Sequence, residues 1–186
     1  MTSAHCRLDR PVVLFGPMAA GKTSVGRALS EITGAPFLDT DALVVAEHGP
    51  IPEIFASLGE QAFRDFEAAA VARALEDAGP AGLVLALGGG AVLREETRVR
   101  LSGAHRVYLT ASWEDVAPRL AGCSDRPLLQ GDAEARWKAL METRGPVFES
   151  LATLRVPTGG PTAAAVAASI AEAIAAPCRI DQGVQA

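Results

Sequence analysis

Short apolar runs alternate along the chain with longer segments of helical periodicity. Val12 to Phe15 is wholly apolar and stops at Gly16, as expected of a strand buried on both faces of a sheet. Further candidate strands follow at residues 36–38, 83–87, 106–109 and 153–156. The alternation predicts an α/β fold in which helices flank a five-stranded parallel sheet.

Apolar residues recur at helical spacing between these strands. Val25, Leu29 and Ile32 share one face of a helix that follows the first strand. Further helices are expected around residues 63–74, 116–120, 137–141 and 162–174, and Ser112 with Asp115 has the spacing of a capping box. Residues 41–62, with two prolines and two glycines, and the polar residues 122–131 break the pattern. We expect both segments to be irregular insertions over a substrate site.

Length and charge narrow the classes of protein that this chain can belong to. Its 186 residues predict a single domain spanning 1–186, and its net charge of −5 argues against a nucleic-acid or anionic-membrane partner. No signal peptide is recognisable, and the longest apolar stretch, at 81–93, is too short to span a membrane. Cys6, Cys123 and Cys178 lack the spacing of a zinc site, which favours free thiols and a cytoplasmic location.

The strongest chemical signal is the sequence GPMAAGKT at residues 16–23, which has the GxxxxGK[ST] spacing of a P-loop. It follows a predicted strand and opens a predicted helix, so that backbone N–H groups and the helix N-terminus can face phosphate oxygens. The lysine neutralises the β- and γ-phosphates, and the threonine hydroxyl ligates Mg²⁺. We therefore expect a nucleoside triphosphate site formed by Gly16, Ala19, Ala20, Gly21, Lys22, Thr23 and Ser24.

Two acidic residues follow the second predicted strand, in the sequence FLDTD. The carboxyl ends of parallel strands share one crevice, so Asp39 and Asp41 should face the phosphates. One carboxylate suits Mg²⁺, directly or through water, and the other could orient an acceptor hydroxyl and take its proton. Taken alone, the pair fits a helix cap and a solvated acid equally well.

Glycines and arginines complete the candidate site. Gly88, Gly89 and Gly90 end a buried strand, where a plain turn needs only one glycine, so we expect the backbone to approach a ligand closely. Singly, an arginine is more typical of an exposed face than of a site. Four arginines nevertheless fall on the irregular segments and at helix edges, namely Arg64, Arg119, Arg126 and Arg144.

Taken in order, six motifs resemble those of the shikimate kinase family: GPMAAGKTSVGRAL, FLDTD, IPEIFASLGEQAFRDFE, LALGGG, RPLL and TRGPVFES. The resemblance runs from about Pro11 to Pro157. It implies a P-loop NTPase fold of the nucleoside-monophosphate-kinase type, with a substrate-binding segment at about 40–66 and a lid at about 121–133. It also implies ATP-dependent phosphorylation of the 3-hydroxyl of shikimate, with one Mg²⁺, on the route to chorismate and the aromatic amino acids.

The family's roles carry over to individual residues of this sequence. Asp41 would hold shikimate hydroxyls and act as the base or orienter for the attacking hydroxyl. Lys22 would serve ATP, and Thr23 and Asp39 would support the metal. Arg64 and Arg144 would grip the shikimate carboxylate, which matches a guanidinium fork.

Other roles implied by the resemblance concern the glycine loop, the lid and the nucleotide. Gly88, Gly89 and Gly90 would line the acceptor with backbone donors. Arg126 would move with the lid to meet the transferring phosphoryl group, and Arg119 would lie near the nucleotide. Two positions depart from the family. Ala19 replaces a common glycine, which we expect to be tolerated, and Phe148 replaces a usual tyrosine.

Two alternatives remain open at this point. One is a P-loop kinase of another small polyol, a nucleoside monophosphate or a carboxylated metabolite such as gluconate. A substrate without a carboxylate would leave Arg64 and Arg144 unpaired. The other is a nucleotide-binding switch without transfer activity, against which Asp41 and Arg126 count. The expected partners are shikimate and ATP, bound by a monomer.

Overall fold

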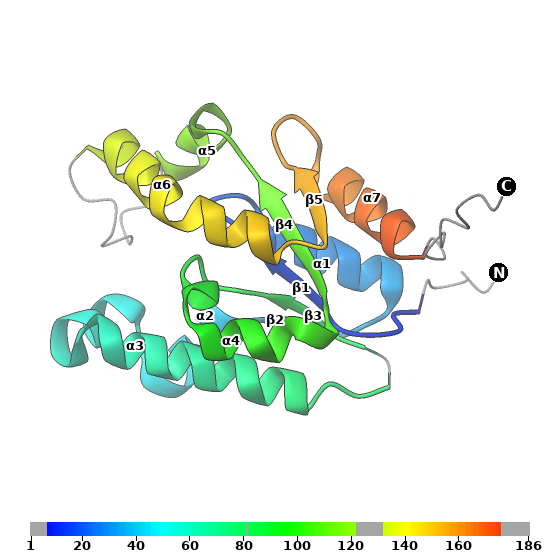
Figure 1. Ribbon diagram of the computed structural model, residues 1–186, viewed down its shortest axis with the longest axis horizontal. Helices are drawn as coiled ribbons and strands as arrows, with labels where there is room; N and C mark the ends of the chain where they lie inside the picture. The colour runs from blue at the N-terminus through cyan, green and yellow to red at the C-terminus, as the bar shows by residue number, and fades with distance from the viewer. Residues whose placement is uncertain (1–6, 81, 122–131, 176–186) are drawn as a thin grey trace, which may run out of the picture.

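The computed structural model describes residues 7–80, 82–121 and 132–175, and its strands form one five-stranded sheet (Figure 1). The strand order is β2-β3-β1-β4-β5, and every pairing is parallel. The strands are β1 (Val12–Phe15), β2 (Phe37–Asp39), β3 (Val84–Ala86), β4 (His105–Thr110) and β5 (Leu154–Pro157). All predicted strands are confirmed, with ends that differ by one residue at most.

Helices cover both faces of the sheet (Figure 1). They are α1 (Lys22–Thr33), α2 (Thr40–His48), α3 (Ile51–Glu76), α4 (Glu95–Arg100), α5 (Trp113–Leu120), α6 (Ala133–Leu151) and α7 (Ala163–Ala175). Two short 3-10 turns, Ala91–Leu93 and Leu101–Gly103, flank α4. Helices α1 and α7 pack in one core cluster on the sheet, whereas α3 and α6 pack in another.

Strict alternation along the strands divides the core between the two faces. In β1, Val12 and Leu14 belong to the cluster with α1 and α7, and Val13 and Phe15 belong to the opposite cluster. All four side chains are at most 1% exposed. Each is worth roughly 1.5–3 kcal/mol of burial, so β1 is anchored from both sides. This anchoring fixes the position of the P-loop that follows it.

The segment predicted to be irregular, residues 41–62, is helical except at Gly49 and Pro50, which separate α2 from α3, and at Gly59. Pro50 precedes α3 and Pro52 lies in its first turn, where a proline costs no helical hydrogen bond. Gly59, with φ 83° and ψ 170°, is the one non-helical residue inside α3 and bends the helix there. The apolar side chains of Val44, Ile54, Phe63 and Ala70 bury one another between α2 and α3. Packing therefore keeps most of the segment helical, and the breaking residues interrupt it only between the two helices and at the kink.

Several predictions fall on residues that the structure does not describe. They include most of the predicted lid with Arg126, and all three cysteines, Cys6, Cys123 and Cys178. Within the described part of the chain, no helix has both the length and the apolar character needed to cross a membrane.

Candidate active site

The phosphate-binding loop joins β1 to α1 and depends on its glycines. Gly16 has φ 142°, and a Cβ there would lie 2.4 Å from the carbonyl oxygen of Leu109, so no other residue fits. Gly21 has φ 86° and precedes Lys22, the first residue of α1. The Lys22 ammonium group donates to the carbonyl oxygens of Gly16 and Pro17, at 3.1 and 2.8 Å. It therefore lies over the loop, as the P-loop motif predicts.

Two further residues shape this loop. Ala19 has φ 61°, the left-handed conformation that disfavours a side chain. The backbone is therefore strained at Ala19, although this position lies in the variable part of the motif. Arg119 donates to the carbonyl oxygens of Ala19 at 3.0 Å and Thr158 at 2.9 Å. It reaches the loop from α5, whose N-terminus has the predicted capping box of Ser112 and Asp115. Arg119 thus lies beside the phosphate-binding loop, and its contact with the nucleotide stays a prediction.

Asp39, the first acid of the FLDTD sequence, accepts hydrogen bonds from two different elements, one set on each carboxylate oxygen. Asp39 Oδ1 caps α2 by accepting from the backbone N–H groups of Asp41 and Ala42, at 3.0 and 3.4 Å. Its Oδ2 accepts a 2.6 Å hydrogen bond from Thr23 Oγ1. A hydroxyl and a carboxylate oxygen thus meet at the start of α1, a donor set that suits Mg²⁺ sharing its coordination with phosphates and water. The described residues contain no cluster of three or more His, Cys, Asp or Glu side chains that could hold a metal alone.

The three consecutive glycines bring the backbone against charged side chains. A Cβ on Gly88 would lie 2.0 Å from Glu67 Oε1 and 2.5 Å from Asp41 Oδ1. A Cβ on Gly90 would lie 2.5 Å from Arg64 Nη1. The N–H of Gly88 donates to Thr40 Oγ1 at 2.9 Å, and the predicted role of the three glycines as backbone donors to the acceptor stays a prediction. Gly88 and Gly90 therefore have no room for a side chain, whereas a Cβ on Gly89 would lie no closer than 3.7 Å to its neighbours.

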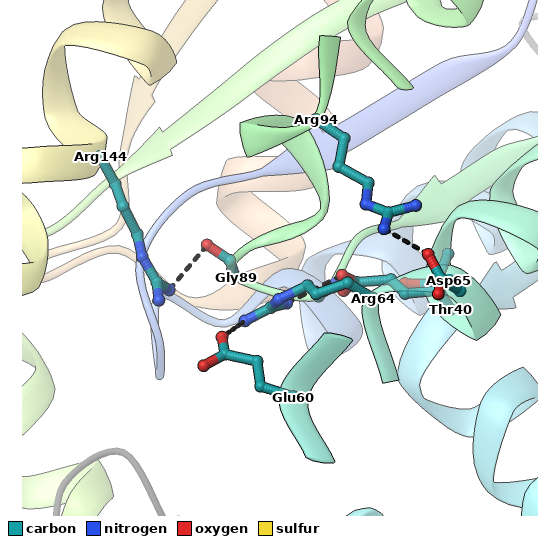
Figure 2. Close-up of polar contacts among 9 residues, drawn as sticks. Thr40, Glu60, Arg64, Asp65, Gly89, Arg94 and Arg144 are labelled. Carbon is teal, nitrogen blue, oxygen red and sulfur yellow. Dashed lines mark hydrogen bonds and ion pairs between the residues drawn. The ribbon is translucent and has the colours of Figure 1, made fainter. Parts of the chain in front are cut away.

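The two arginines predicted to bind a carboxylate both lie at this loop (Figure 2). Arg144 comes from α6, is only 8% exposed, and donates to the Gly89 carbonyl oxygen at 3.1 Å. Arg64 comes from α3 and donates from Nη1 to Glu67 and from Nη2 to Glu60, at 2.9 and 3.0 Å. Burial, and next the charge of Arg64, lower the pKa of Arg144. Two neighbouring cations whose side chains are both largely buried favour an anionic ligand.

Glu67 was not among the predicted site residues. It is 1% exposed, and its Oε1 has no hydrogen-bond partner among the described residues. Burial raises the pKa of Glu67 to about 7, although the Arg64 guanidinium opposes the shift. The available signal was spacing, since Glu67 follows Arg64 by three residues and therefore lies on the same helical face.

The comparisons with known proteins agree with this geometry. The family model for shikimate kinase matches residues 18–175. A shikimate kinase from Thermobifida fusca is 47% identical over 170 residues, which cover 90% of this chain and 97% of that protein. Another from Salinispora arenicola is 45% identical over 165 residues, or 88% and 97% of the two chains. This chain belongs to the shikimate kinase family.

Solved structures support the same family. A shikimate kinase from Acinetobacter baumannii, solved in complex with shikimate, has a TM-score of 0.83 and 35% identity, covering 89% of this chain and 92% of that one. A gluconokinase from Sinorhizobium meliloti has a TM-score of 0.61 and 24% identity over 91% and 93% of the two chains, which shows a shared fold alone. The predicted P-loop NTPase fold and the phosphotransferase class are confirmed, and the shikimate kinase family is favoured over the gluconate alternative.

The fold of this shikimate kinase family member brings together most of the predicted site. The phosphate-binding loop and the glycine loop follow β1 and β3, and Asp39 is the last residue of β2; these three strands are neighbours in the sheet. Arg64 and Arg144 reach the glycine loop from α3 and α6 on one face of that sheet. Arg126 lies outside the described residues, so its role stays a prediction.

Proposed function

We propose that this enzyme transfers the γ-phosphoryl group of ATP to the 3-hydroxyl of shikimate, with the acceptor held between Arg64, Arg144 and the glycine loop. The observation that carries the assignment is the convergence of both guanidinium groups on that loop, next to Asp41. A planar carboxylate is the ligand that two guanidinium groups hold best. Shikimate carries one such group and three hydroxyls.

The acceptor end of the crevice would orient the substrate before reaction. Arg64 and Arg144 would bind the carboxylate, and Asp41 would accept hydrogen bonds from the ring hydroxyls. Asp41 lies close to the place where a Gly88 Cβ would be, and Asp39, two residues before it, contacts Thr23 of the phosphate-binding helix. Anchoring the carboxylate would therefore direct a hydroxyl towards the phosphates. Such positioning supplies much of the catalysis in phosphoryl transfer.

Asp41 is the group that we assign to the attacking hydroxyl itself. As a carboxylate it would orient the 3-hydroxyl of shikimate and take its proton as the new phosphate ester bond forms. Because the transition state is loose, orientation matters more than basicity in this role.

The donor end would bind ATP through the phosphate-binding loop. The backbone N–H groups of 16–23, the α1 N-terminus and the Lys22 ammonium would hold the β- and γ-phosphates. Thr23 and Asp39 would hold one Mg²⁺, which neutralises phosphate charge when bound. Arg119 would lie along the nucleotide, and Arg126 would meet the transferring group, by the family resemblance. These positive groups would stabilise the negative charge that is redistributed over the phosphates during transfer.

The test is a coupled assay of ADP release with Mg-ATP and a panel of acceptors: shikimate, gluconate and nucleoside monophosphates. We expect turnover that depends on shikimate, and a product whose phosphate is on the 3-oxygen by NMR. Turnover with gluconate but not with shikimate would overturn the assignment. ATP binding without turnover on any acceptor would instead indicate a nucleotide-binding switch.

We also propose that the enzyme acts as a monomer in the cytoplasm. The support is that the described site residues come from a single chain and that ATP and shikimate are soluble metabolites. Size-exclusion chromatography with light scattering checks the oligomeric state, and a dimeric mass would contradict it.

A further inference from the structure

Two glutamates hold Arg64, and they differ greatly in exposure. Glu67 is 1% exposed and contacts Nη1 at 2.9 Å, whereas Glu60 is 54% exposed and contacts Nη2 at 3.0 Å. The Arg64 side chain itself is 12% exposed. Glu67 therefore holds Arg64 from within the protein, and Glu60 holds it from the solvent side, the side from which a ligand arrives.

The Glu60 carboxylate also acts on the second arginine. Figure 2 shows it at the tip of the Arg64 side chain, on the side where Arg144 lies. Its negative charge raises the pKa of Arg144, against the larger lowering by burial and by Arg64. Glu60 thus contacts Arg64 directly and also acts electrostatically on Arg144. These are the two arginines that we assign to the carboxylate of the acceptor.

The contact on Nη2 matters because of guanidinium geometry. A guanidinium binds a carboxylate bidentately either through Nη1 and Nη2 or through Nε and Nη2. Both arrangements use Nη2, the nitrogen that Glu60 contacts. An incoming carboxylate must share or replace this contact, and it also meets the negative charge of Glu60.

We propose that Glu60 is an internal competitor for the acceptor's carboxylate: it occupies the Nη2 position of Arg64, and the acceptor binds by displacing it. This inference rests on the proposed role of Arg64 and Arg144 and adds a residue that sets the affinity of that site. Displacement is feasible because Glu60 is the exposed partner of this ion pair, so that its freed carboxylate returns to water, and the acceptor's carboxylate takes its place on the guanidinium. Glu67 cannot leave in this way, because it is buried.

The competitor also gives the site selectivity among anions. An anion that contacts only Arg64 must replace Glu60 without further gain. Shikimate gains contacts with Arg144 and Asp41 as well. Weakly bound anions such as inorganic phosphate are therefore excluded from the acceptor site more strongly than shikimate is.

The test is isothermal titration of shikimate, without nucleotide, into the full chain and three variants. Glu60→Gln keeps the shape of the side chain and removes its charge, and we expect shikimate to bind about 3- to 10-fold more tightly. Glu60→Asp keeps the charge but shortens the reach to Arg64, so a smaller gain is expected. Asp65→Asn is the matched control, since Asp65 is an exposed acid beside Arg64 in sequence but pairs with Arg94. Asp65→Asn reports the general effect of removing one negative charge from this helix.

Two further measurements separate competition from a merely structural role. Inorganic phosphate should compete with shikimate at lower concentration in Glu60→Gln than in the unsubstituted enzyme. In steady-state kinetics, Glu60→Gln should lower the KM for shikimate more than it changes kcat. Unchanged or weaker shikimate binding by Glu60→Gln, or a gain no larger than that of Asp65→Asn, would overturn the proposal.

Arg64→Lys distinguishes failure of this inference from failure of the site assignment. If Arg64→Lys weakens shikimate binding while Glu60→Gln does not strengthen it, Glu60 is a support for Arg64 and only the inference fails. If Arg64→Lys leaves shikimate binding unchanged, the carboxylate site itself has been misassigned and the inference falls with it.

Discussion

Thr23 Oγ1 donates a 2.6 Å hydrogen bond to Asp39 Oδ2, which joins the first turn of α1 to the end of β2. The second oxygen of Asp39 caps α2. A single side chain therefore serves both the proposed metal site and the start of the helix that carries Asp41. Substitution can separate these two roles, because a cap needs only an oxygen, whereas a neutral oxygen in place of the carboxylate attracts Mg²⁺ less strongly.

Asp39→Asn should preserve the fold and impair catalysis. Asparagine caps helices as well as aspartate does, so we expect the free energy of unfolding to change by less than about 1 kcal/mol. The loss of charge beside Thr23 should lower kcat at least tenfold and raise the Mg²⁺ concentration needed for half-maximal turnover. Denaturant unfolding and a Mg²⁺ titration of turnover provide the measurements. Asp39→Ala also removes the cap and should lower the free energy of unfolding by about 1 kcal/mol more than Asp39→Asn does. Equal free energies of unfolding for the two variants would argue against the capping role.

Glu67 should make stability depend on pH. Burial raises its pKa from 4.5 to about 7, so the native state retains a proton that the unfolded state releases. Between these two values, stability falls as the pH rises, by on the order of 3 kcal/mol in total. Glu67→Gln stays neutral throughout and should lose this component.

Urea unfolding of the enzyme and of Glu67→Gln at pH 5 and pH 8 measures the effect as a difference of differences. Other titrating groups are common to both proteins and cancel in the comparison. Parallel stability curves for the two proteins would show that the Glu67 carboxyl group titrates normally in the folded enzyme.

Gly88→Ala should damage both stability and acceptor binding. The new Cβ would lie 2.0 Å from Glu67 Oε1 and 2.5 Å from Asp41 Oδ1, so at least one carboxylate must move. We expect a loss of about 1–3 kcal/mol in the free energy of unfolding and weaker shikimate binding by titration. Gly103→Ala is the control, because a Cβ there meets no atom within 4 Å. Two equally mild substitutions would mean that the glycine loop has room to yield.

Ala19→Gly should stabilise the enzyme. Ala19 has φ 61°, which costs a residue with a side chain roughly 1–2 kcal/mol. Glycine relieves this strain but gains entropy in the unfolded state, which returns about 0.4–1 kcal/mol. We therefore expect the free energy of unfolding to rise by up to about 1.6 kcal/mol, seen as a higher Tm. A lower Tm would show that the loop holds this conformation without strain.

Sequence reasoning was reliable wherever one local rule determined the outcome. The strand β1 is apolar throughout because both faces of the sheet are covered, and a wholly apolar run ending in glycine shows this directly. The P-loop spacing likewise placed Lys22 at the start of a helix. Ser112 and Asp115 form the expected capping box because both partners lie in one helical turn.

Predictions from the sequence failed where tertiary packing decided between local alternatives. The prolines and glycines suggested an irregular segment at 41–62, but the contacts of Val44, Ile54 and Phe63 stabilise two helices there, with breaks only between these helices and at the kink in α3. No local pattern shows that Thr40 accepts the hydrogen bond of Gly88, since these residues are 48 positions apart. Glu60 and Glu67 lie four and three residues from Arg64, a spacing that brings side chains together on a helix. Glu67 falls within the helix predicted around residues 63–74. Glu60 could be predicted as a partner of Arg64 only if that helix were expected to begin before residue 60.

The position of β3 also bears on how the enzyme is made. β3 forms ladders with both β1 and β2, yet it is synthesised after them. A nascent chain that has left the ribosome only as far as α3 holds two strands with no partner between them. When β3 inserts, it joins the phosphate-binding half to the half that carries Asp41 and at the same time delivers the glycine loop. Insertion of β3 therefore joins the two halves before Arg119 and Arg144, which come later in the chain, are added from α5 and α6.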